Sequence, residues 1–188
     1  RADGLLEQSV ALTADDVPVL KAERMRRRAL TLEARGQAER AGELIGEARR
    51  WLLTVETSDA INMAHELERY AAWLMYRLGD LQGAADAFDE LLQRVGMEDG
   101  SLLGLVLNGR GVAAYGLGNY LDAEAFFKRA LKHFQDKDDR RRVCSAHNNL
   151  GMLAAKQGDP RSAASWYEKA LRIHAKLGNR TGLAHTYN

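Results

Sequence analysis

The chain has little of several features that would assign it to a class of protein. It has one cysteine, Cys144, in 188 residues, which excludes an internal disulfide framework and fits a reducing compartment. Two prolines and no long polar stretch leave no interdomain linker, so we expect one domain. The formal net charge of +1 gives no electrostatic indication of a nucleic-acid partner, and we expect none. No long uncharged apolar run occurs and the residues from Arg1 to Gly4 do not resemble a secretory signal. We therefore expect a cytoplasmic location and no membrane partner.

Patterns of catalytic and metal-binding residues are also weak. The five histidines include no pair four residues apart, which is the spacing of a helical zinc site. Residues 109–114 fit the glycine pattern of a dinucleotide-binding turn, but that motif needs a strand before its helix. Arg141, Arg142 and His147 could make Cys144 a reactive thiol, and a packed thiol is the alternative. We predict no catalytic residue, no metal and no cofactor, and the sequence does not indicate an enzyme.

What the chain does contain is an internal repeat built on four glycines. Gly36, Gly79, Gly118 and Gly158 are separated by 43, 39 and 40 residues. An alanine follows each glycine by five residues: Ala41, Ala84, Ala123 and Ala163. A large apolar residue follows by nine: Ile45, Phe88, Phe127 and Tyr167. A small residue precedes each glycine by seven: Ala29, Ala72, Gly111 and Gly151. A period of this size is typical of stacked helical pairs that cannot fold alone.

The residues around the glycines predict a turn between two antiparallel helices. Each glycine tolerates the positive φ at which the first helix ends. Asp80, Asn119 and Asp159 follow three of the glycines and are suited to cap the second helix. Pro160 then falls in a first helical turn, where its missing N–H costs nothing.

This order of residues resembles the tetratricopeptide repeat family. The resemblance covers roughly residues 20–188, and it is strongest from Gly111 to Leu131 and from Asn149 to Leu171. The period is near 40 rather than 34 and the closing proline is missing, as in the long-period branch of kinesin-light-chain-like adaptors and bacterial signalling regulators. The resemblance implies an all-α solenoid, a right-handed superhelix of antiparallel helix pairs.

The register divides the chain into repeats and leaves incomplete ones at both ends. The predicted repeats are 18–57, 58–98, 99–137 and 138–178, with 1–17 as the end of a preceding repeat and 179–188 as the start of another. We therefore expect a segment of a longer protein, and a homodimer formed through exposed terminal helices. The apolar candidates for that contact are Leu5, Leu6, Val10, Leu12, Leu183 and Tyr187.

One face of the first helix in each pair carries side chains suited to binding, and the resemblance places that face on the concave groove of the array. Asparagine can bond a peptide backbone of any sequence, arginine and lysine attract carboxylates, and aromatic residues and methionine make anchors. We call these candidates the first-helix stripe: Arg26, Arg27, Arg69, Tyr70, Trp73, Tyr76, Arg77, Asn108, Tyr115, Asn148, Asn149, Met152 and Lys156.

The stripe predicts a protein- or peptide-binding scaffold whose partner is an acidic or C-terminal segment. The alternative function is a ligand- or peptide-sensing regulatory segment of a larger signalling or transcription-regulating protein. Two alternatives concern the residues themselves: Trp73 and the tyrosines could pack between repeats, and Arg26 and Arg27 could form a solvated face. The run from Arg24 to Arg28 permits nucleic-acid binding, but the acidic residues of the same helix oppose it.

Overall fold

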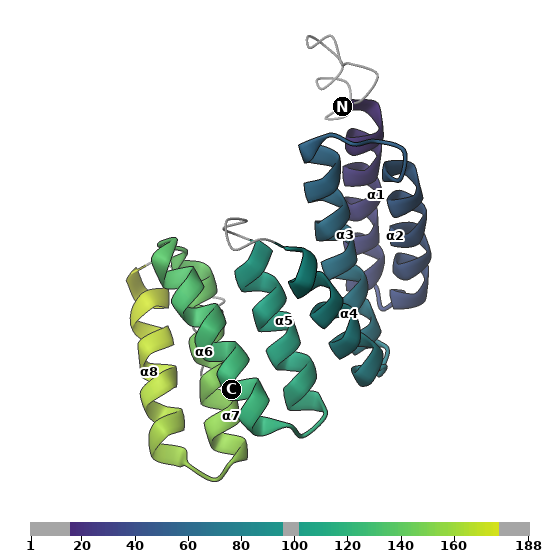
Figure 1. The fold of residues 1–188 in the computed structure, drawn as a ribbon. Helices are drawn as coiled ribbons and strands as arrows, with labels where there is room; N and C mark the ends of the chain where they lie inside the picture. Colours follow the sequence, from purple (N-terminus) through teal and green to yellow (C-terminus); the bar gives the residue numbers. More distant parts are fainter. Residues whose placement is uncertain (1–15, 96–101, 177–188) are drawn as a thin grey trace. The chain divides into compact units, whose positions relative to one another are not determined.

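The computed structural model describes residues 16–95 and 102–176. Within these ranges the chain forms eight α-helices and no strand (Figure 1). The helices are α1 (Asp16–Ala34), α2 (Ala38–Leu52), α3 (Ser58–Arg77), α4 (Leu81–Arg94), α5 (Leu102–Gly116), α6 (Tyr120–Asp136), α7 (Arg140–Lys156) and α8 (Pro160–Lys176). The prediction of an all-α fold of helical pairs is confirmed.

The four repeat glycines form the turns inside the pairs, as predicted. Gly36, Gly79, Gly118 and Gly158 have φ angles of 76°, 91°, 80° and 78°, a region that costs glycine nothing. Two of the three predicted caps also form: Asp80 accepts a hydrogen bond from the Gly83 N–H at 2.9 Å, and Asp159 accepts one from the Ser162 N–H at 3.0 Å.

Asn119 is the exception among the predicted caps. It stands at the N-cap of α6 but makes no side-chain capping bond. Its neutral amide is attracted less strongly than a carboxylate to the positive end of the helix dipole.

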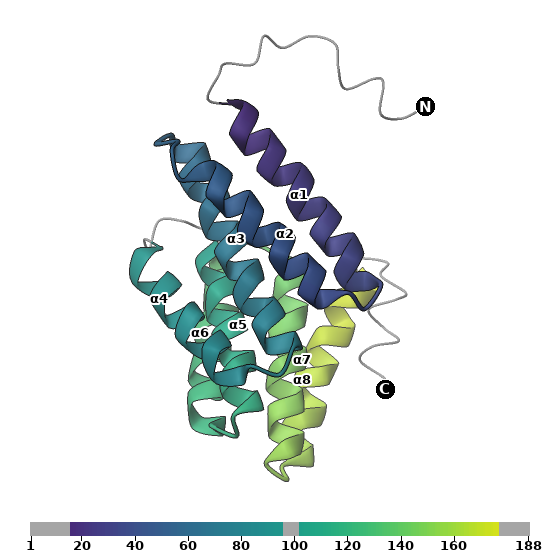
Figure 2. The ribbon, with the colours of Figure 1, turned by 90° about the vertical axis from the view of Figure 1, so that its right-hand side faces the viewer.

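The chain divides into two compact units, Arg1–Ala71 and Ala72–Asn188. In the first, which we call the N-terminal unit, α1 packs against α2 (Figure 2). In the second, the C-terminal unit, α5 packs against α6 and α7 packs against α8, while α4 lies on α5 and α6 lies on α7. This division does not test the prediction of a single domain, which stays a prediction.

Close packing in the C-terminal unit explains why the repeat needs small residues. A Cβ atom at Gly111 would lie 2.7 Å from the ring of Phe127, and one at Gly151 would lie 2.6 Å from the ring of Tyr167. Each large residue nine positions after a turn glycine thus fills the space left by a glycine of the partner helix. In this region the small residues of the repeat mark the helix crossings, as predicted.

None of the described helices is both long and apolar enough to cross a membrane.

Candidate functional site

The first-helix stripe is shared between the two units. Its residues in the N-terminal unit are Arg26 and Arg27 of α1 and Arg69 and Tyr70 of α3. Its residues in the C-terminal unit are Trp73, Tyr76 and Arg77 of α3, Asn108 and Tyr115 of α5, and Asn148, Asn149, Met152 and Lys156 of α7.

In the N-terminal unit the arginines of the stripe are paired with glutamates of their own helices. Arg26 and Arg27 both donate through Nε to Glu23, at 2.7 and 2.8 Å. The hydrogen bond from Arg26, followed by that from Arg27, lowers the pKa of the Glu23 carboxyl below its usual value. Arg69 is paired in the same way with Glu66 at 3.2 Å. These arginines therefore have local partners of opposite charge.

Tyr70 is part of the same network and is not available as a surface anchor. Its side chain is buried at 3% exposure, and its hydroxyl donates a 2.7 Å hydrogen bond to Oε2 of Glu33, which links α3 to α1. Burial, followed by this bond, raises the pKa of Tyr70 far above its usual value. The residue holds the two helices together.

The aromatic residues of the stripe in the C-terminal unit make ring contacts. Trp73 and Tyr76 stack on each other with centroids 5.4 Å apart and planes at 24°, and both are half-buried. Tyr115 contacts Tyr120 of α6 with centroids 5.8 Å apart. Tyr120 was missed because only first helices were considered. Its position directly after the Gly118-Asn119 turn was the available signal.

An asparagine pair connects the two first helices of this unit. Asn149 of α7 donates through Nδ2 to Oδ1 of Asn108 of α5 at 2.8 Å, and both residues are half-buried. Asn148 and Met152 are also half-buried, while Lys156 is exposed. The bond satisfies one donor and one acceptor and leaves the Asn149 Oδ1 and the Asn108 Nδ2 for another partner.

The stripe of the C-terminal unit carries no carboxylate. Following the same helix face past the candidates adds Leu105, Gly109, Val112, Gly116, Ser145 and Ala155, all uncharged. Lys156 has no ion pair among the described residues. This surface therefore offers amides, aromatic rings and positive charge, in contrast to the self-paired arginines of the N-terminal unit.

The remaining sequence candidates have structural roles. Cys144 is buried, its thiol donates to the Ala170 carbonyl at 3.3 Å, and burial raises its pKa, which supports the packed rather than the reactive thiol. Residues 109–114 lie inside α5, so the glycine pattern is not a turn after a strand. In the described part of the chain no three His, Cys, Asp or Glu side chains gather as a metal site would require.

The pairing of helices, the glycine turns and the helix crossings define a helical-repeat protein. Residues 102–176, which span α5 to α8, match the family model of the tetratricopeptide repeat. This part of the chain therefore carries the tetratricopeptide repeat.

Solved structures share this fold over most of the chain. BtubC (BKLC) from P. vanneervenii has a TM-score of 0.69 and 21% identity, over 94% of this chain and 84% of that one. The Rap conjugation gene regulator of the plasmid pLS20, solved in complex with the Phr* peptide, has 0.79 and 17%, over 98% and 49%. A putative kinesin light chain of Podosopora anserina has 0.68 and 14%, over 90% and 86%. The chain thus spans about half of the Rap regulator. A comparison with curated proteins found no match. At these identities the likeness concerns the fold.

Proposed function

We propose that the chain is a protein- or peptide-binding scaffold and that the stripe of its C-terminal unit forms the concave binding face. The tetratricopeptide fold supports a protein-interaction scaffold, although a fold alone does not determine a function. Within the fold, the proposal is carried by the hydrogen bond between Asn149 and Asn108.

This pair is suited to hold an extended backbone. Its open amide donor and carbonyl acceptor match the acceptor and donor that every peptide unit presents. Because the pair joins α5 to α7, its geometry is fixed before a ligand arrives, which reduces the entropy cost of binding. Trp73, Tyr76 and Tyr115 supply aromatic surface in the same unit, and Tyr76 packs close to Gly116 of α5.

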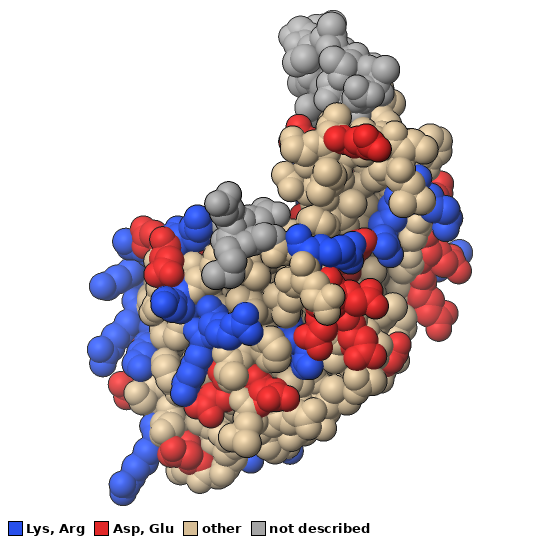
Figure 3. All heavy atoms as spheres, in the orientation of Figure 1, with Lys and Arg blue, Asp and Glu red and all other residues tan. Residues whose placement is uncertain are grey.

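The charge of this face favours an acidic segment or a C-terminal carboxylate as the ligand. The face has no carboxylate to repel such a ligand, and Lys156 and Arg77 are exposed. The Lys and Arg side chains that gather over α6 and α8 in Figure 3 lie on second helices, outside the stripe, and do not contribute to this face. The Rap regulator that shares the fold was solved with a peptide, which supports a peptide ligand here by analogy.

The second candidate function is a ligand- or peptide-sensing regulatory segment of a larger signalling or transcription-regulating protein. The likeness to a conjugation gene regulator supports this candidate by analogy. Both functions are non-catalytic and use the same face. A cytoplasmic location belongs to the proposal and rests on the single, buried Cys144.

The test is a titration of fluorescent acidic peptides that have free C-termini, against the native chain and Asn149→Ala. We expect the variant to weaken peptides of different sequence by a similar factor of about three to ten, because it removes a hydrogen bond to backbone worth about 1 kcal/mol. Lys132→Glu is the control, since Lys132 is an exposed residue of α6 outside the stripe. Equal affinities for the native chain and Asn149→Ala would exclude this face.

A second copy of the chain is a further proposed partner. The apolar residues first predicted for that contact, Leu5, Leu6, Val10, Leu12, Leu183 and Tyr187, lie outside the described residues. The described helices offer a different contact, which follows.

A further inference from the structure

Inside the C-terminal unit, α4 packs on α5, the first helix of the next pair, and a salt bridge between an aspartate and an arginine joins the two helices. Arg110 of α5 donates through Nε to Oδ1 of Asp89 of α4 at 2.9 Å. The guanidinium of Arg110 also lies 5.0 Å from the ring centroid of Phe126 of α6, and the Arg110 side chain is only 14% exposed. In the repeat register, Arg110 stands eight residues before Gly118, Phe126 stands eight after it, and Asp89 stands ten after Gly79.

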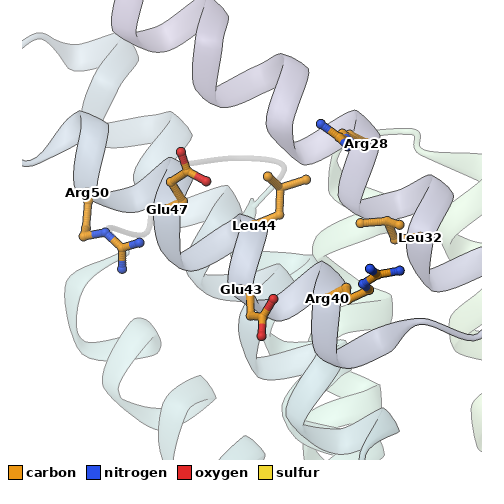
Figure 4. A pocket seen from close by; sticks show the side chains of 7 residues that line it. All are labelled: Arg28, Leu32, Arg40, Glu43, Leu44, Glu47 and Arg50. Atoms are coloured by element: carbon orange, nitrogen blue, oxygen red, sulfur yellow. The ribbon is translucent and has the colours of Figure 1, made fainter.

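The first helical pair, α1 and α2, offers the same kind of surface. No helix of the described residues packs on it. Arg28 stands eight residues before Gly36 and Leu44 stands eight after it. Both line a groove of about 420 Å³ between α1 and α2 (Figure 4), together with Leu32, Arg40, Glu43, Glu47 and Arg50. Arg28 is exposed and, within the described ranges, makes none of the ion pairs that hold its neighbours Arg26 and Arg27.

On the face by which α4 packs against α5, α4 carries the same kinds of residue that α8 carries at the equivalent positions. At six, nine, ten and thirteen residues after the turn glycine, α4 carries Ala85, Phe88, Asp89 and Leu92. At the same positions α8 carries Ala164, Tyr167, Glu168 and Leu171. Glu168 is 65% exposed, and its ion pair with Arg172 is long, at 3.5 Å. Such a pair contributes little stability, so the carboxylate can change partners at low cost.

The carboxylate and the arginine of this contact each occur in every second helical pair along the chain. Only α4 and α8 carry a carboxylate ten residues after the glycine, since α2 has Gly46 and α6 has Lys128 there. Only α1 and α5 carry an arginine eight residues before it, since α3 has Ala71 and α7 has Leu150. Asp89 of the second pair is bonded to Arg110 of the third pair. Glu168 of the fourth pair and Arg28 of the first pair have no equivalent partner of this kind within the described residues.

We propose that two copies of the chain associate head to tail, with α8 of one copy seated in the α1–α2 groove of the next. Glu168 then pairs with Arg28 as Asp89 pairs with Arg110, and the apolar face of α8 covers the leucines of the groove. The contact uses two different surfaces, so it is heterologous and extends to further copies unless a ring closes. This inference rests on the proposal that a second copy is a partner.

The test is sedimentation velocity of the full chain over a wide range of concentrations. We expect concentration-dependent association of the native chain, weakened by at least about tenfold in Arg28→Glu and in Glu168→Arg, because each variant places like charges opposite each other. The double variant, and an equimolar mixture of the two single variants, should both regain association. Lys132→Glu changes the net charge by the same amount as Arg28→Glu and should associate like the native chain.

Three results would overturn the proposal: a native chain that stays monomeric, association that survives Arg28→Glu, or a double variant no better than the single ones. Asn149→Ala should associate normally. The peptide site and the head-to-tail contact can therefore fail independently.

Discussion

Ten and nine residues before the turn glycine, the stripe of the N-terminal unit and the stripe of the C-terminal unit carry residues of different chemistry. In the first, Arg26, Arg27 and Arg69 are each bonded to a glutamate of their own helix, and Tyr70 is buried on Glu33. In the second, the polar contact between helices joins two neutral side chains, Asn108 and Asn149. A repeat register thus predicts where a side chain lies, while its neighbours three and four residues away decide whether it is available to a ligand.

The largest expected effect concerns packing, which leaves no room for a Cβ atom at Gly151 of the C-terminal unit but leaves open space at Gly42 of α2. Gly151→Leu should lower the free energy of unfolding by about 1–3 kcal/mol or more, because the new side chain collides with the ring of Tyr167 and overpacking shifts the backbone. The measurement is chemical unfolding followed by circular dichroism.

The contrasting change in the N-terminal unit is Gly42→Ala, at a position with open space. No atom would lie within 4 Å of the new Cβ atom, and alanine is the better helix former, so this variant should gain about 0.5–1 kcal/mol. If both variants unfold like the native chain, the inferred difference in packing between these two positions is wrong.

A smaller effect is expected from Tyr70→Phe. The variant loses the hydrogen bond to the Glu33 carboxylate, which should cost about 1–2 kcal/mol of stability. Because Tyr70 is buried, affinity for the acidic peptides should stay unchanged. A clear loss of affinity with normal stability would show that the N-terminal stripe does contact the ligand.

Stability should also depend on pH through His147 of the C-terminal unit. His147 is buried and stacked on Trp166 with centroids 5.4 Å apart. Burial, followed by the charge of Lys169, lowers its pKa below the usual 6.5. The unfolded chain therefore binds a proton more readily, and the stability present above pH 6.5 is lost as the pH falls through that value and then through the folded pKa.

The variant His147→Phe keeps a ring against Trp166 and cannot titrate. Compared by thermal unfolding from about pH 8 to about pH 5, it should lose less stability on acidification than the native chain. Parallel curves for the two chains would show that His147 does not contribute.

Most of the fold could be predicted from the sequence because its determinants are local or periodic. The four turn glycines, the caps at Asp80 and Asp159 and the small residues opposite Phe127 and Tyr167 all occupy predicted positions. The missing cap at Asn119 could not be predicted, because whether a polar side chain turns back to the helix depends on small energy differences.

The site was harder to predict than the fold. The pairing of Arg26 and Arg27 with Glu23 was open to sequence reasoning through its spacing of three and four residues. The partners of Asn149, Tyr70 and Tyr115 could not be predicted from the sequence. They depend on how helices of different repeats, or the two helices of one pair, are placed in space. The contacts of Arg110 with Asp89 and Phe126 join three helices. Their correspondence to the first pair can be recognised only when the repeat register and the contacts are both known.

The central claim is that the C-terminal stripe attracts an acidic ligand while the charges of the N-terminal stripe are already neutralised. The most direct test compares Lys156→Glu with Arg27→Glu in titrations of the same acidic peptide at low and high salt. Lys156→Glu should weaken binding about two- to fivefold at low salt and flatten its salt dependence, because it reverses a charge that has no ion-pair partner among the described residues. Arg27→Glu, which alters a pair already formed with Glu23, should leave the affinity within error of the native chain. Equal losses for the two variants, or a loss for Arg27→Glu alone, would contradict the claim.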